Sequence, residues 1–307
     1  MDIAVVIVSW NVRDYVVECL QSVFAEFRKS GLEGRVWLVD NASTDGTIPL
    51  VKDLFPQTHI IENEGNVGFA RANNQGIAAA KPFDPKYYFL LNPDTKLQTS
   101  SLQKLVDSIE TLPNAGMVGA RLVYGNGRFQ HSAFCFPGIV QLTFDLFPMP
   151  ARLYESRWNG RYPRTFYGPD QPPFPVDFPL GATMLVRADV TESTHGMDES
   201  FYMYCEEIDW CWRIHQAGWK IYTVPAAEIV HYGGESSKQI PAQSIINLWR
   251  SRIKLYQRHH TPLRFRIAKK LVKFGLSRKA EQENSPKIQE AYHEAIRLWD
   301  ESQIRIG

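Results

Sequence analysis

Long apolar runs, paired cysteines and an N-terminal targeting segment are all missing from this chain of 307 residues. No apolar run reaches the length that spans a bilayer. The segment after Met1 has no basic flank, and its apolar run is too short for a signal peptide. The four cysteines show no paired metal spacing and are typical of reduced core thiols. We therefore expect a cytoplasmic protein that does not cross a membrane.

Acidic residues are missing from one long segment, residues 236–280. The net charge of +1 hides this division, because residues 1–235 carry 19 Lys and Arg against 27 Asp and Glu, whereas residues 236–307 carry 15 against 6. Such asymmetry suggests an anionic partner, and we expect a peripheral position at the inner face of the plasma membrane. Nucleic acid is the weaker alternative, because amphipathic helices interleave aromatics and cations anyway.

Strand and helix patterns alternate in the first half of the chain. Apolar runs predict buried strands at residues 5–8, 36–39, 59–61 and 87–91. Helical spacing predicts helices from a cap at Asp14 to about residue 27, then at 48–55, 71–80 and around 102–109. This alternation indicates an α/β protein with a mainly parallel central sheet flanked by helices. A glycine-rich dinucleotide fingerprint is missing after the first strand, which argues against a dinucleotide dehydrogenase.

Composition changes twice in the second half. Residues 134–179 hold nine prolines and many aromatics, which excludes long helices and favours an ordered loop with β segments over a disordered linker. After Pro241 the pattern is helical, and a last helix is expected from a Ser285 cap to about residue 302. Two apolar faces occur there: Ile245, Trp249, Ile253 and Tyr256, then Leu263, Ile267, Leu271 and Phe274. The sequence leaves open whether they pack on the protein or lie in a membrane interface.

A carboxylate follows the fourth predicted strand, where the tetrad Asn92-Pro93-Asp94-Thr95 comes directly after residues 87–91. Such a carboxylate lies at the C-terminal edge of the sheet, where open α/β proteins bind ligands. A hard divalent cation prefers carboxylate oxygens. By itself the tetrad is more typical of a plain turn, so the interpretation depends on the other motifs.

Further motifs stand in order around this tetrad. They are residues 5–11, 36–47, 66–77, 201–213 and 231–234. The set closely resembles the inverting nucleotide-sugar glycosyltransferases of family 2, and most of all their rhamnosyltransferase and galactofuranosyltransferase branch. The resemblance covers about residues 3–260 and implies the GT-A fold, with a Rossmann-like, mainly parallel sheet. The expected division is a catalytic domain over 1–240 (nucleotide-sugar half about 1–120, acceptor half about 121–240) and a basic helical extension over 241–307.

The resemblance also implies a divalent cation, Mn²⁺ or Mg²⁺. Asp94 matches the family's metal-binding signature, although Asn92 stands where the first acid is usual. His231 matches the second metal ligand, and an imidazole favours Mn²⁺ over Mg²⁺. Asn92 would contact ribose or ion-bound water. Without the resemblance, His231 would be taken as a surface-loop histidine.

Nucleotide contacts are implied at several strand ends. Asp40 matches the contact to uracil or thymine, whereas Arg71 could hold diphosphate oxygens or be a plain surface arginine. Asn41, Ser43 and Asp45 are equally explained as turn formers, and Asp45 as a helix cap. The expected contacts to the nucleotide sugar are Ser9, Asn11, Asp40, Asn41, Asn66, Gly68, Arg71, Asn92 and Asp94.

A general base is expected in the acidic motif at residues 206–209. Glu207 stands where the family usually has an Asp base, and Glu206 or Asp209 could compensate. Three carboxylates within four residues repel one another, which can raise one pKa toward that of a useful base. Asp209 also has the i, i+4 spacing to Arg213 of a structural ion pair, and acids are favourable at a helix N-terminus in any case.

The expected activity is transfer of a sugar, rhamnose first, from a dTDP- or UDP-sugar to a glycan or lipid-linked saccharide in cell-surface polysaccharide synthesis. Galactofuranose, glucose or another hexose are the alternatives for the sugar. A non-catalytic nucleotide-sugar-binding protein is the alternative class, favoured by Glu207 in place of the usual Asp.

Overall fold

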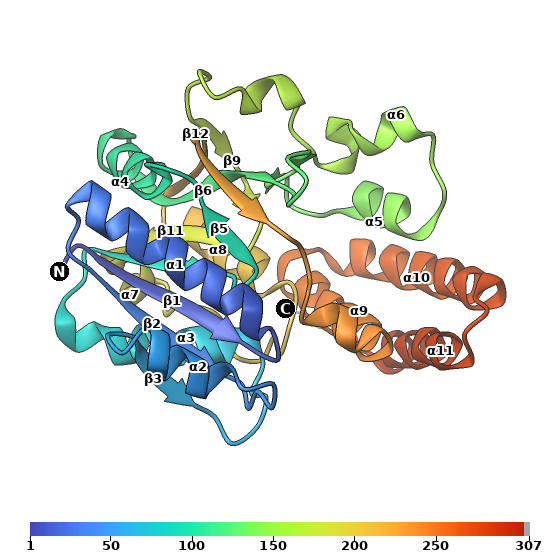
Figure 1. The fold of residues 1–307 in the computed structure, drawn as a ribbon. Coiled ribbons are helices and arrows are strands. Elements are labelled where there is room, and N and C mark those ends of the chain that lie inside the picture. The colour runs from blue at the N-terminus through green and yellow to red at the C-terminus, as the bar shows by residue number, and fades with distance from the viewer. Residues whose placement is uncertain (304–307) are drawn as a thin grey trace.

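A ten-stranded sheet forms the centre of the computed structural model, which describes residues 1–303, the side chain of Ser237 excepted (Figure 1). The strand order is β3-β2-β1-β4-β11-β6-β12-β5, with β7 paired to β6 and β9 to β12. The strands are β1 (Ile3–Ser9), β2 (Gly34–Asp40), β3 (His59–Glu62), β4 (Tyr87–Leu91), β5 (Thr95–Leu97), β6 (Ala115–Val123), β7 (Phe129–Gln130), β9 (Phe174–Val176), β11 (Thr183–Arg187) and β12 (Lys220–His231). A second sheet pairs β8 (Ala133–Phe134) with β10 (Phe178–Pro179).

Helices cover both faces of the sheet and extend beyond it at the C-terminal end (Figure 1). They are α1 (Arg13–Ser30), α2 (Thr47–Leu54), α3 (Phe69–Ala80), α4 (Ser101–Thr111), α5 (Ile139–Leu146), α6 (Ala151–Tyr154), α7 (Ala188–Ser193), α8 (Glu206–Gln216), α9 (Pro241–His259), α10 (Pro262–Gln282) and α11 (Pro286–Glu301). Short 3₁₀ turns lie at Lys81–Phe83, Arg157–Asn159, Arg164–Tyr167 and Ser237–Gln239. The predicted α/β class is confirmed.

Strands β1 to β4 run parallel to one another, so their carboxyl ends meet at one edge of the sheet. Ser9, the last residue of β1, stands opposite Asp40, the last residue of β2. On the other side β12 ends at His231, which pairs with Thr95 of β5. The polar residues that follow these strands are therefore brought to one region, as the sequence predicted for Asp94.

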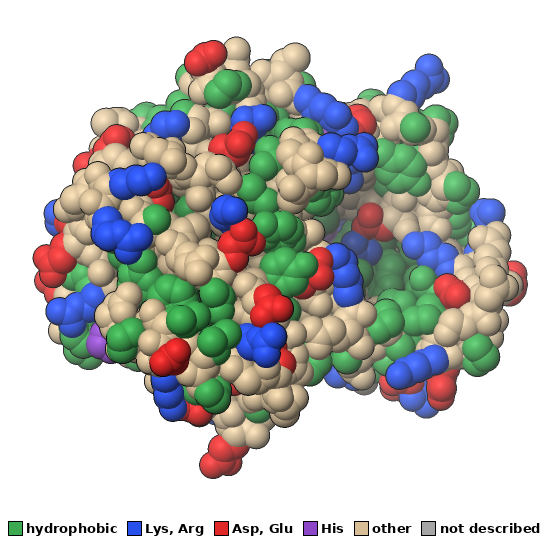
Figure 2. Space-filling view, in the orientation of Figure 1, with side chains coloured by type: hydrophobic (Ala, Val, Ile, Leu, Met, Phe, Trp, Pro, Cys, Tyr) green, Lys and Arg blue, Asp and Glu red, His purple; other side chains and the backbone are tan. Residues whose placement is uncertain are grey.

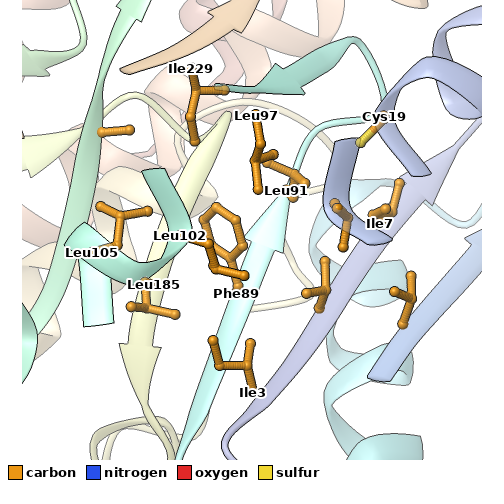
Figure 3. Close-up of a cluster of buried hydrophobic side chains, with 14 of the residues drawn as sticks. Ile3, Ile7, Cys19, Phe89, Leu91, Leu97, Leu102, Leu105, Leu185 and Ile229 are labelled. Atoms are coloured by element: carbon orange, nitrogen blue, oxygen red, sulfur yellow. The ribbon is translucent and has the colours of Figure 1, made fainter. Parts of the chain in front are cut away.

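Two separate apolar clusters pack on the two faces of the sheet. Alternate residues of β1 enter different clusters, because successive side chains of a strand point to opposite faces. Figure 3 shows the first cluster, where Ile3 and Ile7 meet Phe89 of β4 and Leu102 of α4. The second cluster joins the other face of β1 to α3 and α8. Since both faces are covered, the central strands are continuously apolar.

Local details differ from the predictions at two places. Helix α1 begins at Arg13, so Asp14 lies inside its first turn and is not its cap. Residues 134–179 contain the eight-residue helix α5 and the four-residue helix α6 besides their β segments. No helix in this described stretch is longer, as the proline content predicted.

The C-terminal helices use one of their two predicted apolar faces for packing. Trp249, Ile253 and Tyr256 of α9 are buried in a cluster with α5, α10 and α11. Helix α10 instead packs through a different set, namely Phe265, Ala268, Val272 and Leu276. Of its predicted face, Leu271 is partly buried against this cluster, whereas Leu263, Ile267 and Phe274 are 65%, 40% and 64% exposed. The helix carries two apolar stripes, and contact with α5 and α11 selects the one that sequence spacing did not emphasise.

Candidate active site

A cavity of about 310 Å³ opens at the edge where the parallel strands end. Segments from all over the chain contribute, because the sheet order places the ends of β1, β2, β4 and β12 together. Its lining is Val8, Ser9, Trp10, Asn41, Asn66, Phe69, Asn92, Pro93, Asp94, Leu180, Gly181, Ala182, Met203, Tyr204, Glu206, Glu207, His231, Gly234, Glu235 and Ser236. Eight of the predicted site residues, which are far apart in the sequence, therefore line one cavity.

Asp94 and His231 form a pair on one wall of the cavity. The Oδ1 atom of Asp94 lies 3.4 Å from Nε2 of His231, and both side chains are almost fully buried. The other carboxylate oxygen accepts from the backbone amides of Gly233 and Glu235 at 3.1 and 3.4 Å. Nδ1 of His231 is 3.2 Å from Oε1 of Gln130, which orients the ring. Burial raises the pKa of Asp94, but the imidazole and the backbone amide of Glu235 outweigh it and hold that pKa below its usual value.

This pair has the chemistry of two ligands for a divalent cation. Nε2 of His231 is buried, lies 3.4 Å from Oδ1 of Asp94 and makes no hydrogen bond among the described residues, so these two atoms could bind an ion between them. Within the described part of the chain, no group of three or more His, Cys, Asp or Glu side chains could hold a metal ion. A cation held by Asp94 and His231 would thus take its remaining ligands from diphosphate oxygens and water, as Mg²⁺ commonly does at phosphate sites.

Hydrogen bonds connect Asn41, Asn66 and Gly68, and Asp40 precedes Asn41 at the end of β2. Asp40 is buried, and its Oδ2 accepts from the amide of Ser43 at 2.8 Å, while Oδ1 has no partner among the described residues. The amide nitrogen of Asn41 donates to Oδ1 of Asn66 at 3.3 Å. Gly68 has φ +89°, and a Cβ there would lie 2.4 Å from the carbonyl oxygen of Tyr202. Glycine is therefore required at this turn.

Four predicted nucleotide contacts lie outside the cavity lining: Asp40 and Gly68, described above, and Asn11 and Arg71. Asn11 has φ 52°, and its Oδ1 accepts from the amide of Thr44 at 2.8 Å, so its side chain joins two loops. Arg71 is exposed on α3 and does not line the cavity. Asp45 accepts from the backbone amide and hydroxyl of Thr47 and from the backbone amide of Arg13, which is the geometry of a turn former, and the cap of α2 is Gly46.

Glu206 and Glu207 begin α8 and face the cavity. The two preceding residues, Tyr204 and Cys205, both have left-handed backbones, with φ 68° and 66°. This conformation is unfavourable for side chains other than glycine, and such strain is typical of functional sites. Each glutamate has one buried oxygen without a hydrogen-bond partner among the described residues. Burial raises the pKa of Glu207 to about 7, and burial together with the charge of Glu207 raises that of Glu206 well above its usual value.

Asp209 is placed differently from its two neighbours. It is fully buried, lies outside the cavity lining, and its oxygens are occupied by Arg213 at 2.9 Å and by Arg258 and His259 at 2.8 Å. Burial raises the pKa of Asp209, but these three partners outweigh it and lower the value to about 2. The ion pair with Arg213 that the spacing suggested is present, and the carboxylate links α8 to α9.

Several lining residues were not singled out from the sequence. Trp10 and Tyr204 lie inside two of the motifs, but the sequence analysis predicted a role only for other residues of those motifs. Glu235 and Ser236 follow the His231 motif, and the hydroxyl of Ser236 donates to the carbonyl of Trp10 at 3.2 Å. This contact brings the segment after β12 onto the loop after β1. The one feature of the sequence that could have identified these lining residues is their position within or beside a motif.

Comparison with known proteins supports the resemblance seen in the motifs. The model of glycosyl transferase family 2 matches residues 4–188. The N-acetylglucosaminyl-diphospho-decaprenol L-rhamnosyltransferase of Mycobacterium tuberculosis is 29% identical over 220 residues, which cover 68% of this chain and 70% of the relative. Rhamnosyltransferase WbbL of Escherichia coli is 26% identical over 187 residues, or 57% of this chain and 64% of the relative. The predicted family is confirmed.

Solved structures show the same fold at low sequence identity. Mannosyltransferase PcManGT of Pyrobaculum calidifontis, solved with GDP-Man and Mn²⁺, aligns over 98% of this chain and 88% of its own, with a TM-score of 0.55 and 16% identity. The TarS fragment 1–349 of S. aureus aligns over 99% and 92%, with a TM-score of 0.52 and 14% identity. The predicted GT-A fold is confirmed.

We predict that Asp209→Asn lowers the free energy of unfolding at pH 7 by about 3–5 kcal/mol, because three cationic or imidazole groups lose their buried counter-charge. The folded-state pKa is below the unfolded one, so the wild-type contribution is present above about pH 4 and is lost as the pH falls toward about 2.

Urea unfolding of both proteins between pH 7 and pH 3 measures this effect. The difference in unfolding free energy between wild type and Asp209→Asn should become smaller as the pH falls. Asp14→Asn, which removes an exposed partner of Arg13, is the control and should leave the unfolding free energy nearly unchanged, because water screens such a pair. Equal stabilities of wild type and Asp209→Asn at pH 7 would contradict the role of the network.

Proposed function

Because the chain belongs to glycosyl transferase family 2, we propose that it is an inverting enzyme that transfers rhamnose from a dTDP- or UDP-sugar to a lipid-linked saccharide in cell-surface polysaccharide synthesis. One observation carries this proposal: the cavity holds the Asp94–His231 pair and Glu207, one of whose buried oxygens has no hydrogen-bond partner among the described residues. The Asp94–His231 pair would supply two ligands to a cation that also binds the diphosphate. Glu207 would accept the proton of the acceptor hydroxyl. The names of the two bacterial relatives support rhamnose and, for one of them, a lipid-diphosphate acceptor.

Inversion requires a single displacement at the anomeric carbon. The acceptor hydroxyl loses its proton to Glu207 as its oxygen attacks, and the bond from the anomeric carbon to the diphosphate breaks. A carboxyl whose pKa is about 7 is well matched to this role near neutral pH. Asp94 and His231 would hold Mn²⁺ or Mg²⁺, which when bound neutralises charge on the leaving diphosphate. Asp40 and Asn41, at the end of β2, are the residues that we expect to contact the base and ribose.

The exposed face of α10 supports attachment to an anionic membrane surface. Leu263, Ile267 and Phe274 are exposed on it, and Arg266 and Lys270 lie beside them without an ion pair among the described residues. A helix of this kind can lie in a membrane interface with its apolar residues inserted. Each cation near anionic lipid contributes about 1 kcal/mol. In the described part of the chain, no helix combines the length and hydropathy that crossing a membrane would require.

A donor screen with calorimetry tests the nucleotide-sugar site. We expect dTDP-rhamnose or a UDP-sugar to bind in the presence of Mn²⁺, and Asp94→Ala to abolish this metal-dependent binding while the fold survives. Asp53→Ala, an exposed carboxylate on α2, is the control. Donor affinity at the wild-type level in Asp94→Ala would sink the assignment, and absence of binding by every donor would remove the proposed function.

We expect Glu207→Gln to retain donor binding and to lose transfer by about 10²–10⁴-fold, the usual contribution of a general base. Since the base must be ionised, wild-type kcat/KM should rise with pH through about 7 and then level off. The residual activity of Glu207→Gln should lack that rise. If Glu207→Gln turns over normally while Glu206→Gln is inactive, the base is Glu206.

The α10 surface is tested by sedimentation with liposomes that contain anionic lipid. The double variant Leu263→Ser/Phe274→Ser should bind at least several-fold more weakly than wild type at low salt, and wild-type binding should weaken at high salt because the cations are screened. Leu54→Ser removes an exposed leucine on α2 and is the control. No binding by the wild type at low salt, or equal binding by the double variant, rules this surface out.

A further inference from the structure

A second cavity, of about 270 Å³, lies on the other side of Glu207. Tyr204 and Glu207 line both this cavity and the first one, so they form the partition between them. The left-handed backbone at Tyr204 and Cys205 turns the chain at this partition. Glu207, one of whose buried oxygens has no hydrogen-bond partner among the described residues, therefore lies where the two cavities meet.

The walls of the second cavity come from a different part of the fold. Helices α5, α8 and α9 and the segment around residues 134–161 supply them, and no strand end of the parallel sheet takes part. The lining is Phe134, Cys135, Pro137, Gln141, Leu142, Asp145, Asn159, Arg161, Phe178, Tyr204, Cys205, Glu207, Ile208, Leu248, Arg252, Leu255 and Tyr256. Aromatic and apolar surfaces thus alternate with a few polar side chains.

An ion pair crosses the cavity wall from one helix to another. Asp145 of α5 and Arg252 of α9 are joined at 2.5 Å. The guanidinium of Arg252 also lies 4.6 Å from the centre of the Trp249 ring, and Lys279 of α10 donates to the backbone carbonyl of Asp145 at 2.7 Å. These contacts from three helices hold the pair in place, although Asp145 keeps a side-chain exposure of 45%.

This combination fits a saccharide better than a bare lipid or a second nucleotide. A sugar ring has apolar C–H faces that pack on aromatic rings and a rim of hydroxyls that pair with carboxylate, guanidinium and amide groups. A bare lipid chain would leave the Asp145–Arg252 pair desolvated without new partners. A nucleotide would find no cation-binding pair like Asp94 and His231 in this lining.

We propose that the second cavity binds the acceptor saccharide and directs one of its hydroxyls past the edge of Glu207, where the two cavities meet. This inference rests on the proposed function and adds the place of the acceptor. The acceptor oxygen forms the new bond to the anomeric carbon, its proton passes to Glu207, and the nucleoside diphosphate leaves with the electrons of the broken carbon–oxygen bond.

The surroundings of the cavity suit an acceptor that is attached to lipid. Helix α5, which lines the cavity, packs on α10, and a Cβ at Gly275 of α10 would lie 2.7 Å from that of Leu146 of α5. Figure 2 shows the surface hollowed between the region of α5 and the C-terminal helices. The saccharide site is thus next to the helix whose outer face carries Leu263, Ile267 and Phe274.

The double variant Asp145→Asn/Arg252→Met tests the inference, because it removes both charges and nearly keeps the side-chain volumes. The probe is N-acetylglucosaminyl diphosphate with a short alkyl chain, which needs no membrane. We expect the KM for this probe to rise at least about 10-fold, while donor affinity and slow donor hydrolysis in the absence of acceptor stay at wild-type levels. The control is Glu294→Gln/Arg297→Met, which removes an exposed ion pair on α11.

Binding of the probe is also measured by calorimetry with nucleoside diphosphate and Mn²⁺ present, so that the outcome does not depend on turnover. Weaker binding of the probe by Asp145→Asn/Arg252→Met than by wild type supports the site. If the enzyme nevertheless transfers sugar from none of the donors, only the proposed function fails. Equal binding by both proteins, no binding by the wild type, or loss of donor affinity in the variant overturns the inference. Thermal unfolding of each variant shows whether the fold is retained.

Discussion

The buried carboxylate of Asp209 is the interaction on which the geometry of the candidate site depends. It joins Arg213 of its own helix to Arg258 and His259 of α9, nearly 50 residues later in the chain. Such a charge is costly to bury and is stable only when all its partners are in place. The ring of His259 also stacks on Trp212 of α8 at 4.4 Å between centroids. These contacts with α9 fix the position of α8, whose first residues line the cavity.

This arrangement makes the C-terminal helices part of the site. Leu255 of α9 packs with Phe201 and Cys205 directly before α8, and Ser251 donates to the carbonyl of Met203 at 2.7 Å. Residues 241–307 were predicted as an extension, and that division into two parts stays a prediction. In the structure, helix α9 of this extension directly contacts the acidic motif and the residues before it.

Three carboxylates within four residues acquire different properties because their surroundings differ. Asp209 is surrounded by cations and has a lowered pKa, whereas Glu206 and Glu207 are buried without such partners and have raised pKa values. A carboxyl group with a pKa near 7 can accept a proton at neutral pH, and one with a pKa near 2 is a permanent counter-charge. Separation of acid–base and structural roles follows from burial and neighbours, not from the residue type.

The sequence by itself determined the order of strands and helices, the apolar faces of the sheet, and the polar motifs at the strand ends, because all of these depend on local periodicity and on the rule that parallel strands end at one edge. Its motifs also indicated the family to which the chain belongs. Only the tertiary structure decided which carboxylate faces the cavity, which stripe of α10 is buried, and that a second cavity adjoins Glu207. Those features depend on contacts between residues about 50 or more positions apart, such as Asp209 with His259 and Asp145 with Arg252. No local pattern specifies which of several suitable partners such a side chain will meet.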